Sequence, residues 1–175
     1  MNLPAKFAYL ATEPAPKLLL EALKLFGTHE IPGKQHSPVI MSWLKELGFS
    51  WINDDETPWC GTAMAIAAVR AGVASLRQPE MPRAFWWCKW GNPTAVPMLG
   101  DVLVFSFSHV GIYVGEDEHH YYVLGGNQAN RHGIDPFPKS SLKCARRTPW
   151  RVARPASVRR IFIDGTGLAK AVATR

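Results

Sequence analysis

The spacing of apolar residues changes once along this 175-residue chain, and that change limits the folds the chain can adopt. In the first half, apolar residues recur at helical spacing, as in "PKLLLEALKLFG" (residues 16–27) and "SPVIMSWLKELG" (residues 37–48). Both segments have proline near the start and glycine at the end, as helices commonly do. After "NPTAVPMLG" (residues 92–100) the runs become β-rich. Helices followed by strands predict an α+β fold with an antiparallel sheet.

Three runs carry the strand signal: "DVLVFSF" (101–107), "HVGIYVG" (109–115) and "YYVLGGNQ" (121–128). Before them, "EMPRAFWWCKWG" (80–91) predicts a short aromatic helix or turn. After them, "ARRTPWRVARP" (145–155) and "VRRIFIDG" (158–165) can add one or two strands to the sheet.

The length and the 47% hydrophobic content predict a single domain over residues 1–175. Within it we expect an N-terminal extension over about residues 1–15 and a basic C-terminal extension over about residues 143–175. The second region holds nine Lys or Arg residues against one acid, Asp164. Such a segment is attracted to a polyanion, or is simply a solvated basic face.

The sequence has no apolar run long enough to cross a membrane. Its first residues lack the basic segment, apolar stretch and small-residue cleavage site of a signal peptide. We therefore expect synthesis in the cytoplasm, with any export by another route, and a monomeric protein.

"TPWCGTAMAIAAVRAG" (residues 57–72) predicts a helix that carries a cysteine near its start. Thr57 can serve as the N-cap and Pro58 fits the first position, which makes Cys60 the third helical residue. The N–H groups and positive dipole of a helix start lower the pKa of a thiol from about 8.5, and they can bind an oxyanion. Cys60 is therefore a candidate nucleophile. The alternative is a buried structural thiol, which is common for free cysteine.

The chain has three cysteines, so they cannot all pair and at least one thiol stays free. Their spacing matches no metal-binding clip. Of the six histidines, His109 is the best candidate base, because it opens a predicted strand and so projects from a rigid scaffold. His119 and His120 lie in the charged turn "GEDEHH", where solvation is the simpler interpretation and a third metal ligand is lacking. We expect no metal.

Hairpin pairing supplies a third candidate. If Gly115 lies opposite Tyr121, antiparallel pairing places Asn127 opposite His109, about 5 Å away and on the same face. The Asn127 carbonyl could then orient the His109 ring toward Cys60. A slip of one residue would instead bring Gly126 or Gln128 opposite His109, and Gln128 would be the substitute. The adjacent glycines could also allow a bulge or a close approach.

"PWCGTAMAIAAVRAG", "WGNPTAVPMLGDVLVFSFSHVGIYVGE" and "VLGGNQ", in this order and spacing, resemble the NlpC-like and CHAP-type cysteine amidohydrolase/peptidase superfamily of bacteria and phages. The resemblance runs from about residue 29 to 128. It implies a papain-like α+β fold whose nucleophile helix packs on an antiparallel sheet. It also implies Cys60 as nucleophile, His109 as base and Asn127 as the residue that orients the histidine, with no cofactor.

Members of this superfamily mostly cleave amide bonds in peptidoglycan. The resemblance therefore implies an endopeptidase or N-acetylmuramoyl-L-alanine amidase, either a phage endolysin or an antibacterial effector, that acts at the cell wall or in the periplasm after release or injection. A basic protein would concentrate at an anionic envelope, and we expect no nucleic-acid partner. Tryptophans near Cys60, among them Trp59 and Trp87, can line a substrate groove or belong to the core. Glu30 and His36 are candidates for the rim of the same groove.

Two other functions stay open at this point. An acyltransferase on the same scaffold would pass the acyl group to an amine or lipid instead of water. A non-catalytic basic module would bind envelope or nucleic acid. A non-catalytic module would not explain why a cysteine at a helix start and a histidine at a strand start occur together.

Overall fold

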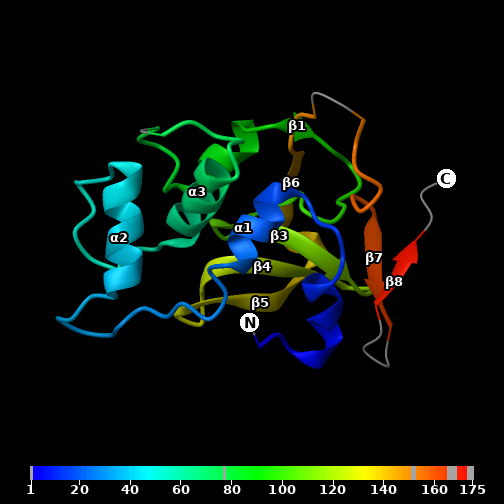
Figure 1. The fold of residues 1–175 in the computed structure, drawn as a ribbon, viewed down its shortest axis with the longest axis horizontal. Coiled ribbons are helices and arrows are strands. Elements are labelled where there is room, and N and C mark those ends of the chain that lie inside the picture. Colours follow the sequence, from blue (N-terminus) through cyan, green and yellow to red (C-terminus); the bar gives the residue numbers. More distant parts are fainter. Residues whose placement is uncertain (1, 77, 151–152, 165–168, 173–175) are drawn as a thin grey trace.

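We analysed a computed structural model, which describes residues 2–76, 78–150, 153–164 and 169–172. The fold is α+β with a largely antiparallel sheet, which confirms the predicted class (Figure 1). The sheet has eight strands, of which six follow the order β1-β6-β2-β3-β4-β5. β7 pairs in parallel with the end of β3, and β8 pairs with β7. The strands are β1 (Asn92–Pro93), β2 (Val102–Phe105), β3 (His109–Glu116), β4 (His120–Gln128), β5 (Arg131–Pro138), β6 (Leu142–Arg147), β7 (Arg160–Ile163) and β8 (Ala169–Val172).

Three α-helices precede the strands: α1 (Lys17–Leu23), α2 (Pro38–Leu47) and α3 (Cys60–Arg70). Short 3-10 helices lie at Ala5–Ala11 (η1), Ala84–Lys89 (η2) and Lys139–Ser141 (η3). α3 is central: it contacts α1 and α2, and also β3 and β4 (Figure 1). The main core lies between these helices and the sheet, and a smaller apolar cluster covers part of the other face.

The first two helices form where the sequence predicts them. α2 follows Ser37 and Pro38, and it ends at Gly48, whose φ of 76° is left-handed and therefore suits glycine. α1 is shorter than predicted, because residues 24–27 form turns instead of continuing the helix.

α3 begins two residues later than predicted. Trp59, not Thr57, is its N-cap, and Cys60 is its first helical residue. The reason is local: the backbone N–H of Thr57 donates to the Asp54 carboxylate at 2.6 Å, which holds Thr57 in the preceding turn. Residues 60–68 are buried all round, because helices cover one side of α3 and the sheet covers the other.

Small residues let α3 approach its neighbours closely. A Cβ atom added to Gly126 on β4 would lie 2.6 Å from the Trp59 ring and 2.7 Å from the Ala63 Cβ. A Cβ atom added to Gly61 would lie 2.0 Å from the carbonyl oxygen of Pro82. The start of α3 is therefore in direct contact with the sheet and with the backbone that leads into η2.

The three β-rich runs form β2, β3 and β4, and the two later segments contribute β6 and β7. Sequence reasoning missed β1, β5 and β8. β5 occupies an edge of the main path, and two of its eight residues are Pro136 and Pro138. Backbone bonds join His132 of β5 to residues 27 and 28, so the first part of this edge is covered.

The described parts of the two segments predicted as extensions both belong to the folded domain. η1 packs on the core through buried Phe7 and Leu10, and the Tyr9 hydroxyl donates to the carbonyl of Val114 in β3. Residues 143–147 lie in β6, between β1 and β2. Several basic side chains of the C-terminal region form ion pairs: Arg147 with Asp101 at 2.7 Å, Arg159 with Glu13 at 2.8 Å and Arg160 with Glu116 at 2.7 Å.

Among the described residues, no helix is long and apolar enough to span a membrane.

Candidate active site

Cys60 is the free cysteine of the chain, since Cys88 and Cys144 form a disulfide. Its side chain lies at the first position of α3 and is 4% exposed. Burial raises the pKa of the Cys60 thiol, although the backbone N–H groups of Val110, Gly61 and Cys60 itself point at the sulfur and act in the opposite direction. The resting side chain is therefore a neutral thiol with N–H donors already in place.

His109 is the first residue of β3 and follows the hairpin turn after β2. Ser108 in that turn has φ 63°, a left-handed value that is uncommon for a residue other than glycine and costs energy. The His109 ring is buried beside Phe137, with 5.0 Å between ring centroids. Burial lowers the pKa of His109 to about 4, so its resting form is the neutral imidazole.

The structure brings Cys60 and His109 to one cavity. The backbone N–H of Val110, the residue after His109, is directed at the Cys60 sulfur and acts to lower the pKa of its thiol. Both side chains line a pocket of about 600 Å³, which we call the His109 pocket. Its other walls are Pro58, Phe107, Ser108, Asn127, Gln128, Ala129, Asp135 and Phe137.

The residue that contacts the histidine is Gln128. Its amide nitrogen lies 3.1 Å from Nε2 of His109 and also donates to the carbonyl of Val123 at 3.2 Å. With Gln128 on Nε2, the ring nitrogen that can take the thiol proton is Nδ1. For Nδ1 to be unprotonated, Nε2 must carry the ring proton, and the buried Oε1 of Gln128, which has no hydrogen-bond partner among the described residues, accepts that proton once the amide is turned. Asn127 lines the same pocket, but the contact predicted between Asn127 and the His109 ring is made by Gln128.

The irregular end of β4, and not the hairpin register, accounts for the difference. Ile112 pairs with Leu124 and Tyr113 with Val123, as the predicted register requires. A bulge then shifts the pairing, so that Gly115 lies opposite Tyr122 and the predicted Gly115–Tyr121 pair is wrong. Near His109, the β4–β5 pairing also shifts between Gly125 and Gln128, where Asn127 has φ 56°.

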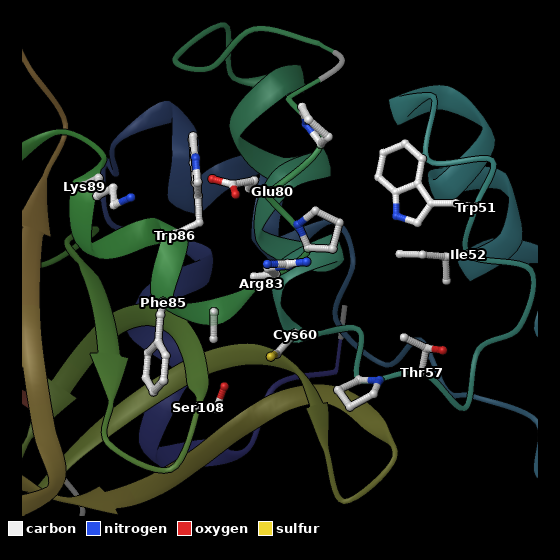
Figure 2. Close-up of a pocket in the computed structure, with 14 residues that line it drawn as sticks. Trp51, Ile52, Thr57, Cys60, Glu80, Arg83, Phe85, Trp86, Lys89 and Ser108 are labelled. Carbon is white, nitrogen blue, oxygen red and sulfur yellow. The ribbon is translucent and has the colours of Figure 1, made fainter.

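A second cavity, of about 680 Å³, lies on the other side of Cys60, and we call it the Arg83 pocket. It shares Pro58, Cys60 and Ser108 with the His109 pocket, so the sulfur lies between the two halves of one cleft. Figure 2 shows the guanidinium of Arg83 reaching into this half, with Cys60 and Ser108 at its lower end. Its other walls come from residues 51–52, residues 79–80, residues 82–86, Thr57 and Lys89.

Exposed aromatic side chains flank the whole cleft. Trp51 and Phe85 line the Arg83 pocket and are 57% and 42% exposed, while Phe107 lines the His109 pocket and is 52% exposed. Sequence reasoning missed all three.

The predicted groove tryptophans are core residues. Trp59 is 2% exposed, and its indole N–H donates to the Glu30 carboxylate at 3.0 Å. Trp87 is fully buried, and its indole N–H donates to the carbonyl of Met81 at 3.0 Å. Trp86, next to Trp87, does line the Arg83 pocket.

Glu30 and His36 belong to a supporting loop and not to the walls of the cleft. Nδ1 of His36 lies 3.1 Å from the buried carboxylate of Asp55, which also accepts the backbone N–H groups of Ile31 and Ser37. Together with the Glu30–Trp59 bond, these contacts tie residues 30–37 to the segment that leads into α3. The two residues therefore hold the start of α3 instead of rimming a groove.

Among the described residues, no group of three or more His, Cys, Asp or Glu side chains is arranged to hold a metal ion. No protein-family model matches the sequence, and a search of curated proteins found no significant match either.

Proposed function

We propose that the protein is a cysteine hydrolase of papain-like type that cleaves an amide bond of peptidoglycan. One observation carries the catalytic part of the proposal: a free thiol at the start of α3 and a histidine at the start of β3 line the same cleft, and Gln128 contacts Nε2 of the histidine. This is the nucleophile, base and orienting residue that acyl transfer through a thiol requires.

The chemistry follows from the resting charges. Both pKa values are shifted toward the neutral forms, so we expect His109 to take the thiol proton as the sulfur attacks the amide carbonyl. A carbon–sulfur bond forms, and the carbonyl oxygen becomes an oxyanion. Backbone N–H groups at the start of α3 lack helical carbonyl partners and can stabilise that charge.

Collapse of the intermediate breaks the carbon–nitrogen bond, and His109 returns the proton to the leaving amine. The acyl group remains on Cys60 as a thioester. Water, deprotonated by His109, then attacks the thioester and releases a carboxylic acid and the free thiol. Every proton in the cycle passes through His109, and no cofactor is needed.

Three features support peptidoglycan as the substrate. The sequence resembles peptidoglycan hydrolases in the motifs that hold Cys60, His109 and the end of β4. The exposed aromatic side chains along the cleft suit the faces of sugar rings and the stems of peptides. The net charge of +6 favours binding at an anionic cell wall.

Digestion of purified sacculi tests this proposal. The wild-type protein and the Cys60→Ala variant are incubated with sacculi, and the released fragments are identified by mass spectrometry. We expect fragments from the wild type alone, and the new termini name the bond: a free muramoyl lactate indicates an amidase, whereas new ends within the stem indicate an endopeptidase. Equal release by Cys60→Ala would refute the nucleophile, and release by neither protein would refute the substrate.

A further inference from the structure

The two halves of the cleft differ in charge, because among the described residues unpaired cations line only one of them. Arg83 and Lys89 line the Arg83 pocket against one acid, Glu80. The ammonium group of Lys143 lies 5.0 Å from the ring centroid of Phe85 in the wall of that pocket. The ionisable wall residues of the His109 pocket are Cys60, His109 and Asp135, and Asp135 accepts from Arg131 at 2.8 Å.

The cations of the Arg83 pocket are available to a ligand. In the part of the chain that the structure describes, neither Arg83 nor Lys89 forms an ion pair with a carboxylate. Arg147, Arg159 and Arg160, by contrast, each have an acidic partner. Figure 2 shows the Arg83 guanidinium directed into the pocket, where a bound carboxylate would meet it.

The wall that carries Arg83 is firmly held. The backbone of Pro82, directly before Arg83, packs on Gly61 so tightly that a Cβ atom there would lie 2.0 Å from the Pro82 oxygen. Further along, Trp87 is fully buried, and the disulfide from Cys88 to Cys144 ties η2 to β6. Arg83 is therefore placed at a fixed distance from the residue next to the nucleophile, as specificity requires.

The position of His109 sets the direction of the substrate. The leaving amine must lie near the group that protonates it, so the amine part of the substrate belongs in the His109 pocket. The acyl part, which stays on Cys60 as the thioester, then extends into the Arg83 pocket. We propose that the Arg83 pocket binds the acyl part of the substrate and that Arg83 selects an acyl part with a free carboxylate near the scissile bond. This inference rests on the proposed function.

Soluble muropeptides, released from sacculi by a glycosidase, provide the probe. One portion is left native, and in the other the free carboxylates are converted to carboxamides with carbodiimide and ammonia. We expect amidation to lower kcat/KM of the wild type by about tenfold or more, as the loss of a hydrogen bond between charged groups would. Arg83→Gln should show a similar loss on native muropeptides and little further loss on amidated ones. Arg83→Lys should recover part of the preference.

Lys45→Gln is the matched control, because it removes an exposed positive charge on α2, away from the cleft. We expect it to retain both the activity and the preference of the wild type. Product inhibition tests the direction: Arg83→Gln should weaken inhibition by the purified acid product, but not by the purified amine product.

The outcomes separate the two proposals. If the wild type cleaves neither muropeptide pool, the proposed function fails. If the wild type and Arg83→Gln respond equally to amidation, cleavage stands but the selection by Arg83 is refuted. If Arg83→Gln weakens inhibition by the amine product instead, the assigned direction of the substrate is wrong.

Discussion

The amide nitrogen of Gln128 lies 3.1 Å from Nε2 of His109, at the point where β4 leaves its regular pairing with β5. A second bond, from Gln128 to the carbonyl of Val123, fixes the amide from its other side. The neighbouring Asn127 lines the same pocket but has left-handed φ. The two adjacent amides therefore have different tasks, and substitution can separate them.

We predict that Gln128→Ala lowers kcat for muropeptide cleavage by roughly 10- to 100-fold, because His109 loses the partner that orients its ring. Asn127→Gly is the matched variant, since glycine adopts the left-handed conformation without strain. It should keep kcat within about threefold of the wild type, by the same geometric argument. A larger loss in Asn127→Gly than in Gln128→Ala would return the orienting role to Asn127.

The neutral resting pair predicts slow alkylation of Cys60 near neutral pH. Burial raises the pKa of Cys60 and lowers the pKa of His109 to about 4, so a preformed thiolate–imidazolium pair is disfavoured. The rate of iodoacetamide labelling, followed by intact-protein mass spectrometry, should rise steadily with pH above the usual thiol range of about 8.5. His109→Gln should leave that profile nearly unchanged. A rapid, pH-independent plateau between pH 5 and 7 that disappears in His109→Gln would show an ion pair instead.

The contact between α3 and β4 predicts that Gly126→Ala is costly. Its new Cβ atom would overlap the Trp59 ring and Ala63, and overpacking of this kind typically costs about 1–3 kcal/mol. Because the same contact sets the position of Cys60, activity should fall with stability. Gly115→Ala is the control: its Cβ atom would first meet the flexible end of Ile163, at 3.0 Å. Urea denaturation of both variants measures the difference, and equal stability losses would contradict the prediction.

The disulfide between Cys88 and Cys144 closes a sequence separation of 56 residues, and removal of such a link typically costs about 2–5 kcal/mol. We predict that the Cys88→Ala/Cys144→Ala double variant unfolds at lower urea concentration than the wild type and has a higher KM, because η2 carries the wall of the Arg83 pocket. Dithiothreitol should lower the stability of the wild type toward that of the variant and leave the variant unchanged. Wild-type stability that is unaffected by dithiothreitol would contradict a stabilising disulfide.

Local signals predicted much of this fold. Ser37, Pro38 and Gly48 mark the ends of α2 in the sequence, and the structure places those ends where the residues indicate. β2, β3 and β4 follow from runs of β-branched and aromatic residues. β5 escaped prediction because His132, Gly133 and two prolines hide its alternation, and only its pairing with β4 makes it a strand.

Some residues of the candidate site could also be predicted from local sequence signals, and others could not. Cys60 and His109 stand at the start of a helix and the start of a strand; the sequence predicts the strand start at His109 and the helix start two residues too early. The choice between Asn127 and Gln128 depends on irregular pairing, and a period of two does not reveal where a bulge falls. Arg83 and Trp51 lie outside the helix that carries Cys60, so only tertiary packing places their side chains in its cleft.

The prolines of β5 affect whether the edge of this sheet can pair with a strand from another molecule. The N–H and C=O of His132 point outward, toward residues 27 and 28, and alternation gives Pro136 and Pro138 the same outward direction. A strand from another molecule would find no amide donor at either proline, and the start of the edge is already occupied. The two prolines therefore reduce the number of hydrogen bonds that a strand from another molecule could form here, which disfavours edge-to-edge pairing at this border of the sheet.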